Sequence, residues 1–220
     1  MKTVRIDFVS DIACPWCAVG LASLEKALSN VGDDANVEIY FQPFELNPHM
    51  PPGGQDVIEH LTEKYGTTVS QVKANQENIR KRAAEMGFQF HPEGRKWVYN
   101  TFNAHRLLHW ALHEHGLDQQ RRLKKELLAS YFTLAVNMDD LNHLINAVER
   151  AGLPIDRARL ILESDEFATE VRNQQKKYTE LGITSVPSII FDNKYLIQGA
   201  QAPDMFASAV RDCAQESEGQ

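Results

Sequence analysis

The sequence predicts an α/β fold in which a parallel strand–helix–strand unit is followed by a long helical insertion and a closing hairpin. Strand-like stretches occur only near the two ends of the chain, at residues 4–9, 37–42, 188–191 and 195–197. Residues 55–181 show helical periods and helix punctuation only. The chain therefore reads as a small sheet interrupted by one large all-helical segment.

The first strand, Val4 to Val9, is followed by the stretch DIACPWC, and a helical pattern begins within this stretch and continues after it. Pro15 suits the first turn of that helix, because its missing N–H would be unpaired there and its fixed φ is already helical. The apolar residues of the helix recur at spacings of four, three and four, at Cys17, Leu21, Leu24 and Leu28. Cys14 is therefore expected at the mouth of a helix.

Cys14 and Cys17 form a Cys-x-x-Cys pair in a strand–helix–strand setting, which is typical of redox chemistry. Free N–H groups and the positive end of the helix dipole favour the Cys14 thiolate, which is the form that attacks a disulfide. Cys17 lies one turn further inward, within reach of Cys14, and we expect Cys14 to have access to solvent at the helix end. A zinc site would need a second pair, and the only other cysteine is Cys213. A structural disulfide over so short a loop would stabilise little.

The composition is that of an ordinary globular protein, with 43% hydrophobic and 24% charged residues among 220. A net charge of −7 argues against nucleic acid as a partner. The basic clusters 80–82 and Arg121, Arg122, Lys124 and Lys125 are interpreted as solvated helix faces. No apolar run is long enough for a bilayer, and Asp7 and Asp11 interrupt any signal-peptide core. We therefore expect a cytoplasmic protein without membrane contact, in which a vicinal cysteine pair is catalytic.

The helical insertion follows a second strand that ends at Pro43 and an irregular connection over 44–54. We interpret the insertion as a lid. Its helices are expected from a Ser70 cap to Met86, from an Asn103 cap to Gly116, from Gln119 to Leu134, from Asp140 to Ala151, and from Asp165 to Gly182.

Strand signals return in a hairpin around Asp192-Asn193-Lys194, and Pro203 suits the start of a closing helix through Cys213. This order of elements is that of a thioredoxin fold with an insertion. We expect residues 1–54 and 182–220 to form the thioredoxin-fold domain and residues 55–181 the helical insertion domain.

Val186-Pro187 directly precedes the hairpin. A proline that opens a central strand must avoid a ladder hydrogen bond, and a cis bond at a tight turn achieves this. We expect the turn to lie against Cys14 and to expose the Val186 backbone to an extended substrate. The alternative is an ordinary trans turn.

Five stretches together resemble the cytosolic DsbA-like oxidoreductases of the FrnE type: DIACPWC at 11–17, FELNP at 44–48, NTFNAHRL at 100–107, Val186-Pro187, and GAQ at 199–201. The resemblance covers nearly the whole chain. It implies that Cys14 attacks, that Cys17 resolves the mixed disulfide, and that Val186-Pro187 is the cis-proline turn. The buried acid of thioredoxins corresponds in position to Phe8, which leaves Asp7 and Asp11 as candidates.

Other side chains are candidates for the substrate cleft. Pro15 and Trp16 lie between the cysteines, and Phe102, His105 and Arg106 come from a helix of the insertion. Arg106 suits a carboxylate such as one of glutathione, although these three residues equally suit a role in joining lid to core. His105, His109 and His113 recur every fourth residue, and we interpret them as surface histidines of an amphipathic helix and expect no metal. Cys213 is expected to be a small buried hydrophobe.

The sequence thus predicts a thiol–disulfide oxidoreductase that acts through a mixed disulfide, without a resident cofactor. Its substrate would be a protein or small molecule bearing a thiol or disulfide, with glutathione as a candidate co-substrate. Two alternatives stay open. One is a glutathione-dependent isomerase or transferase of the kappa-class and hydroxychromene-carboxylate isomerase group, and the other is a non-catalytic peptide-binding chaperone.

Overall fold

A four-stranded mixed sheet lies at the centre of the computed structural model, which describes residues 3–216. Its order is β2-β1-β5-β6, with bounds Asn36–Pro43, Thr3–Ser10, Ser188–Phe191 and Tyr195–Gln198. β1 and β2 are parallel, whereas β5 is antiparallel to both β1 and β6. This arrangement is a thioredoxin fold with a helical insertion, which confirms the predicted α/β class.

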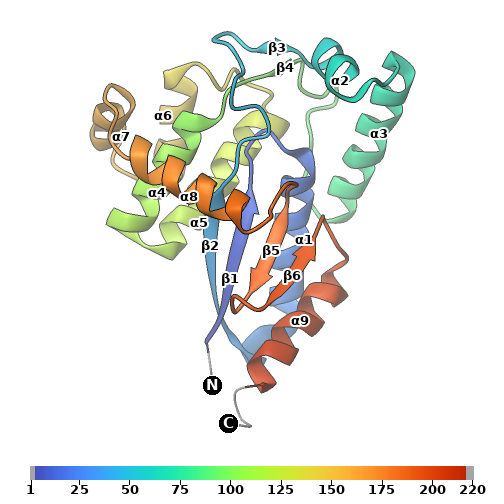
Figure 1. Cartoon of the computed structure of the whole chain (residues 1–220), viewed down its shortest axis with the longest axis vertical. Coiled ribbons are helices and arrows are strands. Elements are labelled where there is room, and N and C mark those ends of the chain that lie inside the picture. Colours follow the sequence, from blue (N-terminus) through green and yellow to red (C-terminus); the bar gives the residue numbers. More distant parts are fainter. Residues whose placement is uncertain (1–2, 217–220) are drawn as a thin grey trace.

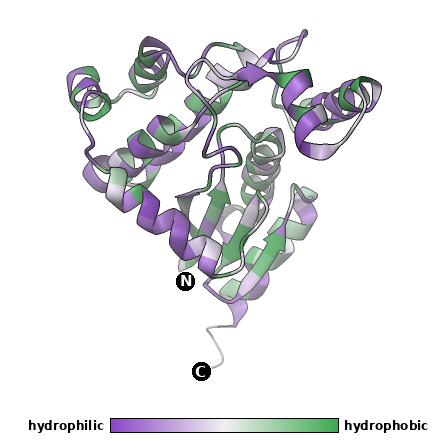
Figure 2. Ribbon diagram, turned by 45° about the horizontal axis from the view of Figure 1, so that its top comes forward, coloured by the Kyte–Doolittle hydropathy of each residue, from purple (hydrophilic) through white to green (hydrophobic). Residues whose placement is uncertain are grey.

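Helices cover both faces of this sheet (Figure 1). α1 (Pro15–Val31) and α9 (Pro203–Gln215) pack together behind β5 and β6, and α8 (Ala168–Glu180) crosses the opposite face. β1 is consequently buried over most of its length, and Figure 2 shows the central strands in hydrophobic colours. β1 alternates the apolar residues Val4, Ile6 and Phe8 with the polar Arg5 and Asp7, and Asp7 is nevertheless buried because helices cover both faces.

The segment between β2 and β5 is mainly helical, as predicted. A short 3-10 turn at Gly32–Asp34 separates α1 from β2. Besides α8, the segment contains α2 (Val57–Tyr65), α3 (Val69–Glu85), α4 (Phe102–His115), α5 (Leu117–Leu128) continuing into a π-helical turn (Ala129–Thr133), α6 (Leu141–Arg150) and α7 (Ile155–Leu162). Two short strands, β3 (Gln55–Asp56) and β4 (Trp97–Val98), pair within it, so the prediction of helices alone is wrong there. Strands of two residues are too short to show a period.

The hairpin and the last helix begin and end close to the predicted positions. Asp192 and Asn193 adopt the left-handed conformation, with φ of 50° and 56°, which these residue types tolerate best. Pro203 is the first residue of α9, and Cys213 on that helix is buried in the core. α6 begins directly after its N-cap Asp140, one residue after the predicted start.

Other helix starts differ from the prediction, and the residues that precede these helices make no side-chain capping hydrogen bond. α4 begins after Thr101 rather than at Asn103, and α8 begins after Phe167 rather than at Asp165. α5 begins at Leu117, two residues early, and α7 between Pro154 and Glu163 is absent from the prediction. Short helices are set by tertiary packing more than by local signals.

The cap of α3 is Thr68 rather than Ser70. Thr68 accepts a hydrogen bond from the backbone N–H of Gln71, and the Gln71 side chain accepts one from the backbone N–H of Thr68. This reciprocal capping box satisfies two helix-end donors that Ser70 cannot reach from inside the helix.

We expect Thr68→Ala to lower the free energy of unfolding by about 1 kcal/mol, because the capped donor loses its acceptor. Denaturant unfolding measures the change. Ser70→Ala is the matched control and leaves stability within about 0.5 kcal/mol of the parent. Equal effects of the two substitutions would contradict the cap assignment.

Candidate active site

The cysteine pair lies at the start of α1, directly after the central strand. Cys14 is the N-cap residue and Pro15 the first helical residue, as predicted. The Cys17 backbone N–H donates to the Cys14 carbonyl at 3.1 Å. Both thiols are free, and they lie close together without a bond.

Cys14 is the more acidic thiol of the pair. A hydrogen bond from the Cys17 thiol lowers the pKa of Cys14, and it outweighs burial, which acts in the opposite direction. The Cys17 backbone N–H and the charge of Arg95 lower this pKa further. The first turn of a helix is where thiolates are stabilised in other proteins.

Cys17 lies deeper, and burial raises its pKa well above the ordinary value. It is therefore a neutral thiol at rest and a hydrogen-bond donor to Cys14. The expectation that Cys14 is open to solvent is wrong, because this residue is only 3% exposed and Cys17 is fully buried. Two residues of the helical segment, Arg95 and Tyr65, lie near enough to interact electrostatically with Cys14.

The loop before β5 faces Cys14. The Val186–Pro187 peptide bond is cis, and the Cys14 thiol donates to the Val186 carbonyl at 3.5 Å. Gly20 on α1 lets this loop approach closely, because a Cβ there would lie 3.1 Å from Cγ of Pro187. The structure thus brings Cys14, Val186 and Pro187 together.

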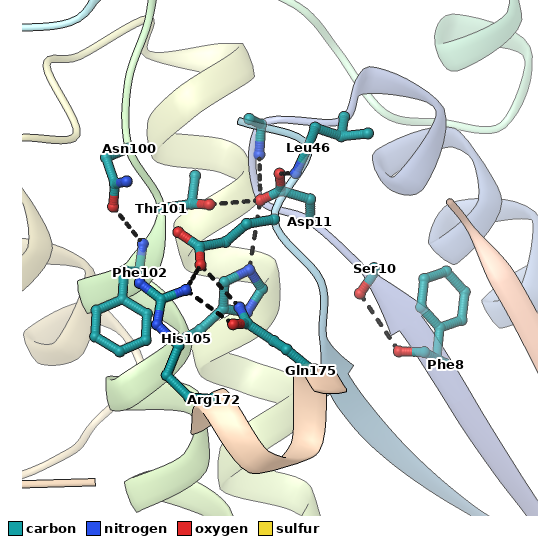
Figure 3. Close-up of polar contacts among 12 residues, drawn as sticks. Phe8, Ser10, Asp11, Leu46, Asn100, Thr101, Phe102, His105, Arg172 and Gln175 are labelled. Carbon is teal, nitrogen blue, oxygen red and sulfur yellow. Dashed lines mark hydrogen bonds and ion pairs between the residues drawn. The ribbon is translucent and has the colours of Figure 1, made fainter. Parts of the chain in front are cut away.

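Asp11 is the buried acid of the site, and Figure 3 shows the donors that surround it. Its carboxylate accepts hydrogen bonds from the Thr101 hydroxyl at 2.7 Å and from Nε2 of His105 at 3.4 Å. It also accepts from the backbone N–H groups of Ala13 and Leu46, at 3.2 and 2.7 Å. Burial acts to raise the pKa of Asp11, but the hydrogen bond and charge of His105, with the other donors, hold it below its usual value.

Asp7, the other candidate acid, belongs to a different cluster. It accepts hydrogen bonds from Arg5, from the Gln42 amide at 2.6 Å and from the Tyr178 hydroxyl at 3.2 Å. None of these groups belongs to the cysteine site, so Asp11 rather than Asp7 is the acid that lies near the cysteines.

Arg95 is a site residue that the sequence analysis missed. Its guanidinium donates to the carbonyl of Ala13, next to Cys14, and lies over the rings of Tyr131 and Phe132 at 5.0 and 5.3 Å. It comes from the loop before β4, where no periodic pattern or motif sets it apart. Only the folded chain places this charge beside the thiol.

The remaining predicted residues fall into two groups. Pro15 and Trp16 are half-buried beside the cysteines, and Trp16 packs on α1 and α3. Phe102 lies under the exposed guanidinium of Arg172, 3.7 Å from it, in a half-buried cluster in which Arg172 also bonds to the buried carboxylate of Glu45 and to Gln175 (Figure 3). His105 faces Asp11 rather than an open cleft.

Arg106 is oriented toward the loop between α7 and α8. Its guanidinium donates to Asn103 and to the backbone carbonyls of Ile161, Ser164 and Glu166. These bonds favour the interpretation in which Arg106 holds helices together over the one in which it binds a substrate carboxylate.

The expectation that His105, His109 and His113 all lie on the surface of α4 is wrong for two of them. His105 and His109 are buried, whereas His113 is exposed. Within residues 3–216, no group of three or more histidine, cysteine or acidic side chains is arranged to hold a metal ion.

We expect the carboxamidomethylation rate of Cys14 to reach half its maximum at a pH below about 8.5, the ordinary midpoint of a cysteine, because the thiolate is the reacting form. Mass spectrometry of the alkylated peptide across pH gives the midpoint. Cys17→Ala removes the donor thiol and should move the midpoint upward. A parental midpoint at or above the ordinary value would contradict the geometry.

A free cysteine pair in the first turn after a central strand, facing a cis-proline loop, defines a dithiol site of the thioredoxin-fold class. The chain belongs to the family of DSBA-like thioredoxin domains, whose family model matches residues 5–211. It is thus a member of a thiol–disulfide oxidoreductase family.

Solved structures agree with this membership. A probable DsbA oxidoreductase from Streptomyces coelicolor is 33% identical, with a TM-score of 0.89 over 97% of this chain and 91% of that one. At 15% identity, a 2-hydroxychromene-2-carboxylate isomerase shares the fold, with a TM-score of 0.69 over 98% and 99% of the chains. The cytosolic disulfide reductase DsbM from Pseudomonas aeruginosa, solved also with GSH, shares it at 13% identity and a TM-score of 0.63 over 97% of each chain. No helix in the described part of the chain is long and apolar enough to cross a membrane.

Proposed function

We propose that the chain is a cytoplasmic thiol–disulfide oxidoreductase of the FrnE type that acts through Cys14-Pro15-Trp16-Cys17. The Cys14 thiolate attacks a substrate disulfide, and Cys17 then attacks Cys14 in the mixed disulfide and releases the substrate thiol. The opposite pKa shifts of the two thiols carry this proposal. The lowered pKa of Cys14 favours the thiolate that attacks, whereas the raised pKa of Cys17 keeps that thiol protonated until the resolving step.

The surroundings of Cys14 support a substrate in extended conformation. The Val186 carbonyl and the Pro187 turn form one wall, and the half-buried Pro15 and Trp16 flank the thiol. A protein substrate has to displace part of the cover over Cys14, whereas a small disulfide needs less room.

Glutathione is the co-substrate that we propose, and the chain needs no resident cofactor for the chemistry. The tripeptide carries carboxylates, and Arg95 places a positive charge beside Cys14. DsbM has been solved with GSH, and it shares this fold.

Equilibration of the protein in buffers of graded reduced-to-oxidised glutathione ratio tests the proposal. Alkylation of the remaining thiols should reveal one reversible transition in which Cys14 and Cys17 lose their thiols together. A midpoint near about −270 mV indicates a reductase and one near about −120 mV an oxidant. Thiols that persist at every ratio, or a pair that does not close, would refute the assignment.

A further inference from the structure

Lys124 is a buried lysine that takes no part in the thiol–disulfide exchange proposed above. The sequence places it in a basic cluster of α5 that was interpreted as solvated, but its side chain is completely buried. Its neighbour Lys125 is about half exposed and pairs with Glu25. Within the described residues, the Lys124 ammonium has no hydrogen-bond partner.

The ammonium lies near enough to the cysteine site to interact with it electrostatically. Its Nζ is 5.9 Å from the centre of the Phe41 ring on β2. One turn earlier on α5, the Gln120 side chain accepts a hydrogen bond from the Phe41 backbone N–H and donates one to the Phe41 carbonyl, both at 3.0 Å. The acidic groups that interact electrostatically with Lys124 are Cys17, Asp11 and Cys14, in that order of strength. Burial lowers the pKa of Lys124 to about 8 despite these three groups.

A buried cation without a hydrogen-bonded partner is costly, and replacing it with an apolar residue would ordinarily be neutral or favourable. Asp11 compensates for it only in part, because its carboxylate attracts the ammonium through space but accepts its four hydrogen bonds from other groups. Cys17 is different, because its sulfur is neutral at rest and becomes an anion only during the reaction.

We propose that Lys124 is a positioning residue that stabilises the thiolate of Cys17 during the resolving step. This inference rests on the proposed function. In that step Cys17 gives up its proton, its sulfur bonds to Cys14, and the Cys14–substrate S–S bond breaks. The leaving thiolate takes up a proton, so a mixed disulfide and a thiol become an internal disulfide and a thiol. The ammonium offers the charge that the buried Cys17 anion otherwise lacks.

The test uses dithiobis(nitrobenzoate), which releases one nitrothiophenolate when Cys14 attacks and a second when Cys17 resolves the mixed disulfide. Lys124→Met keeps the length of the side chain without its charge. We expect the second release to slow by about tenfold, because loss of the ammonium raises the Cys17 pKa further and removes thiolate faster than the gain in nucleophilicity restores the rate. The first release should change less, because Lys124 interacts more strongly with Cys17 than with Cys14.

The same variant should be at least as stable as the parent toward denaturant, since a desolvated charge is gone. A purely structural lysine would give the opposite result, with lost stability and an unchanged second release. Lys125→Met is the matched control and should leave both releases unchanged. Lys124→Gln, also uncharged, repeats the test if the methionine variant does not fold.

The outcomes separate this inference from the proposed function. A parent that never gives a second release would refute the resolving role of Cys17 itself. A parental second release together with an equally fast one in Lys124→Met overturns the role of Lys124 alone. Failure of both variants to fold also overturns it, because the fold would then require the lysine for its own stability.

Discussion

Cys17→Ser should reduce turnover of a disulfide substrate by about a hundredfold or more and should accumulate a mixed disulfide at Cys14. The serine hydroxyl fits the buried position of Cys17, but it cannot attack the Cys14–substrate bond. Cys14 keeps its place at the N-cap of α1 and still attacks. Non-reducing gels and intact mass, together with the turnover rate, measure the trapped species.

Cys213→Ser serves as the control, because Cys213 is an equally buried thiol that lies on α9 rather than at the site. It should leave turnover unchanged. The rival functions give other results with Cys17→Ser. A glutathione-dependent isomerase has no need for a resolving thiol and would keep its activity. A peptide-binding chaperone would protect unfolded clients even as Cys14→Ala/Cys17→Ala, with no disulfide turnover by the parent.

The sheet could be predicted because its strands and turns carry local signals. β1 carries apolar residues at Val4, Ile6, Phe8 and Val9, the Asp192–Asn193 turn tolerates positive φ, and Pro203 suits the first turn of a helix. The pairing of β3 with β4 joins two residues to two residues across a long separation, and no local pattern encodes it. Local periodicity thus accounts for the elements of the sheet but not for the details of the insertion.

The candidate site likewise has a part that the local sequence predicted and a part that only tertiary contacts create. The position of Cys14 at a helix mouth follows from Pro15 and the apolar spacing, which are features of neighbouring residues. Arg95 and Lys124 become site residues only through tertiary contacts of the loop before β4 and of α5, and tertiary contacts also decide between the candidate acids Asp11 and Asp7. The charged neighbours of Lys124 predicted a solvent-exposed helix face, because no local pattern distinguishes a buried lysine from an exposed one.

Asp11 links three separate segments, and its loss should have the largest effect on stability. Its carboxylate joins the turn before α1, the loop after β2 and the start of α4. We expect Asp11→Ala to lower the free energy of unfolding by about 3–5 kcal/mol, because Thr101, His105 and the Leu46 N–H lose their buried acceptor. Asp33→Ala, at an exposed carboxylate, should stay within about 0.5 kcal/mol of the parent.

The pH dependence of this loss has a definite sign. The folded pKa of Asp11 is lowered, so its contribution is complete above the unfolded pKa of about 3.9 and disappears as the pH falls through the lower folded value. The stability difference between parent and Asp11→Ala should therefore be constant near neutral pH and shrink in acid. Asp11 also acts to raise the pKa of Cys14, so the variant's alkylation midpoint should move downward. A stability difference that grows in acid, or a midpoint that moves upward, would show that Asp11 does not act as an ionised carboxylate beside the thiol.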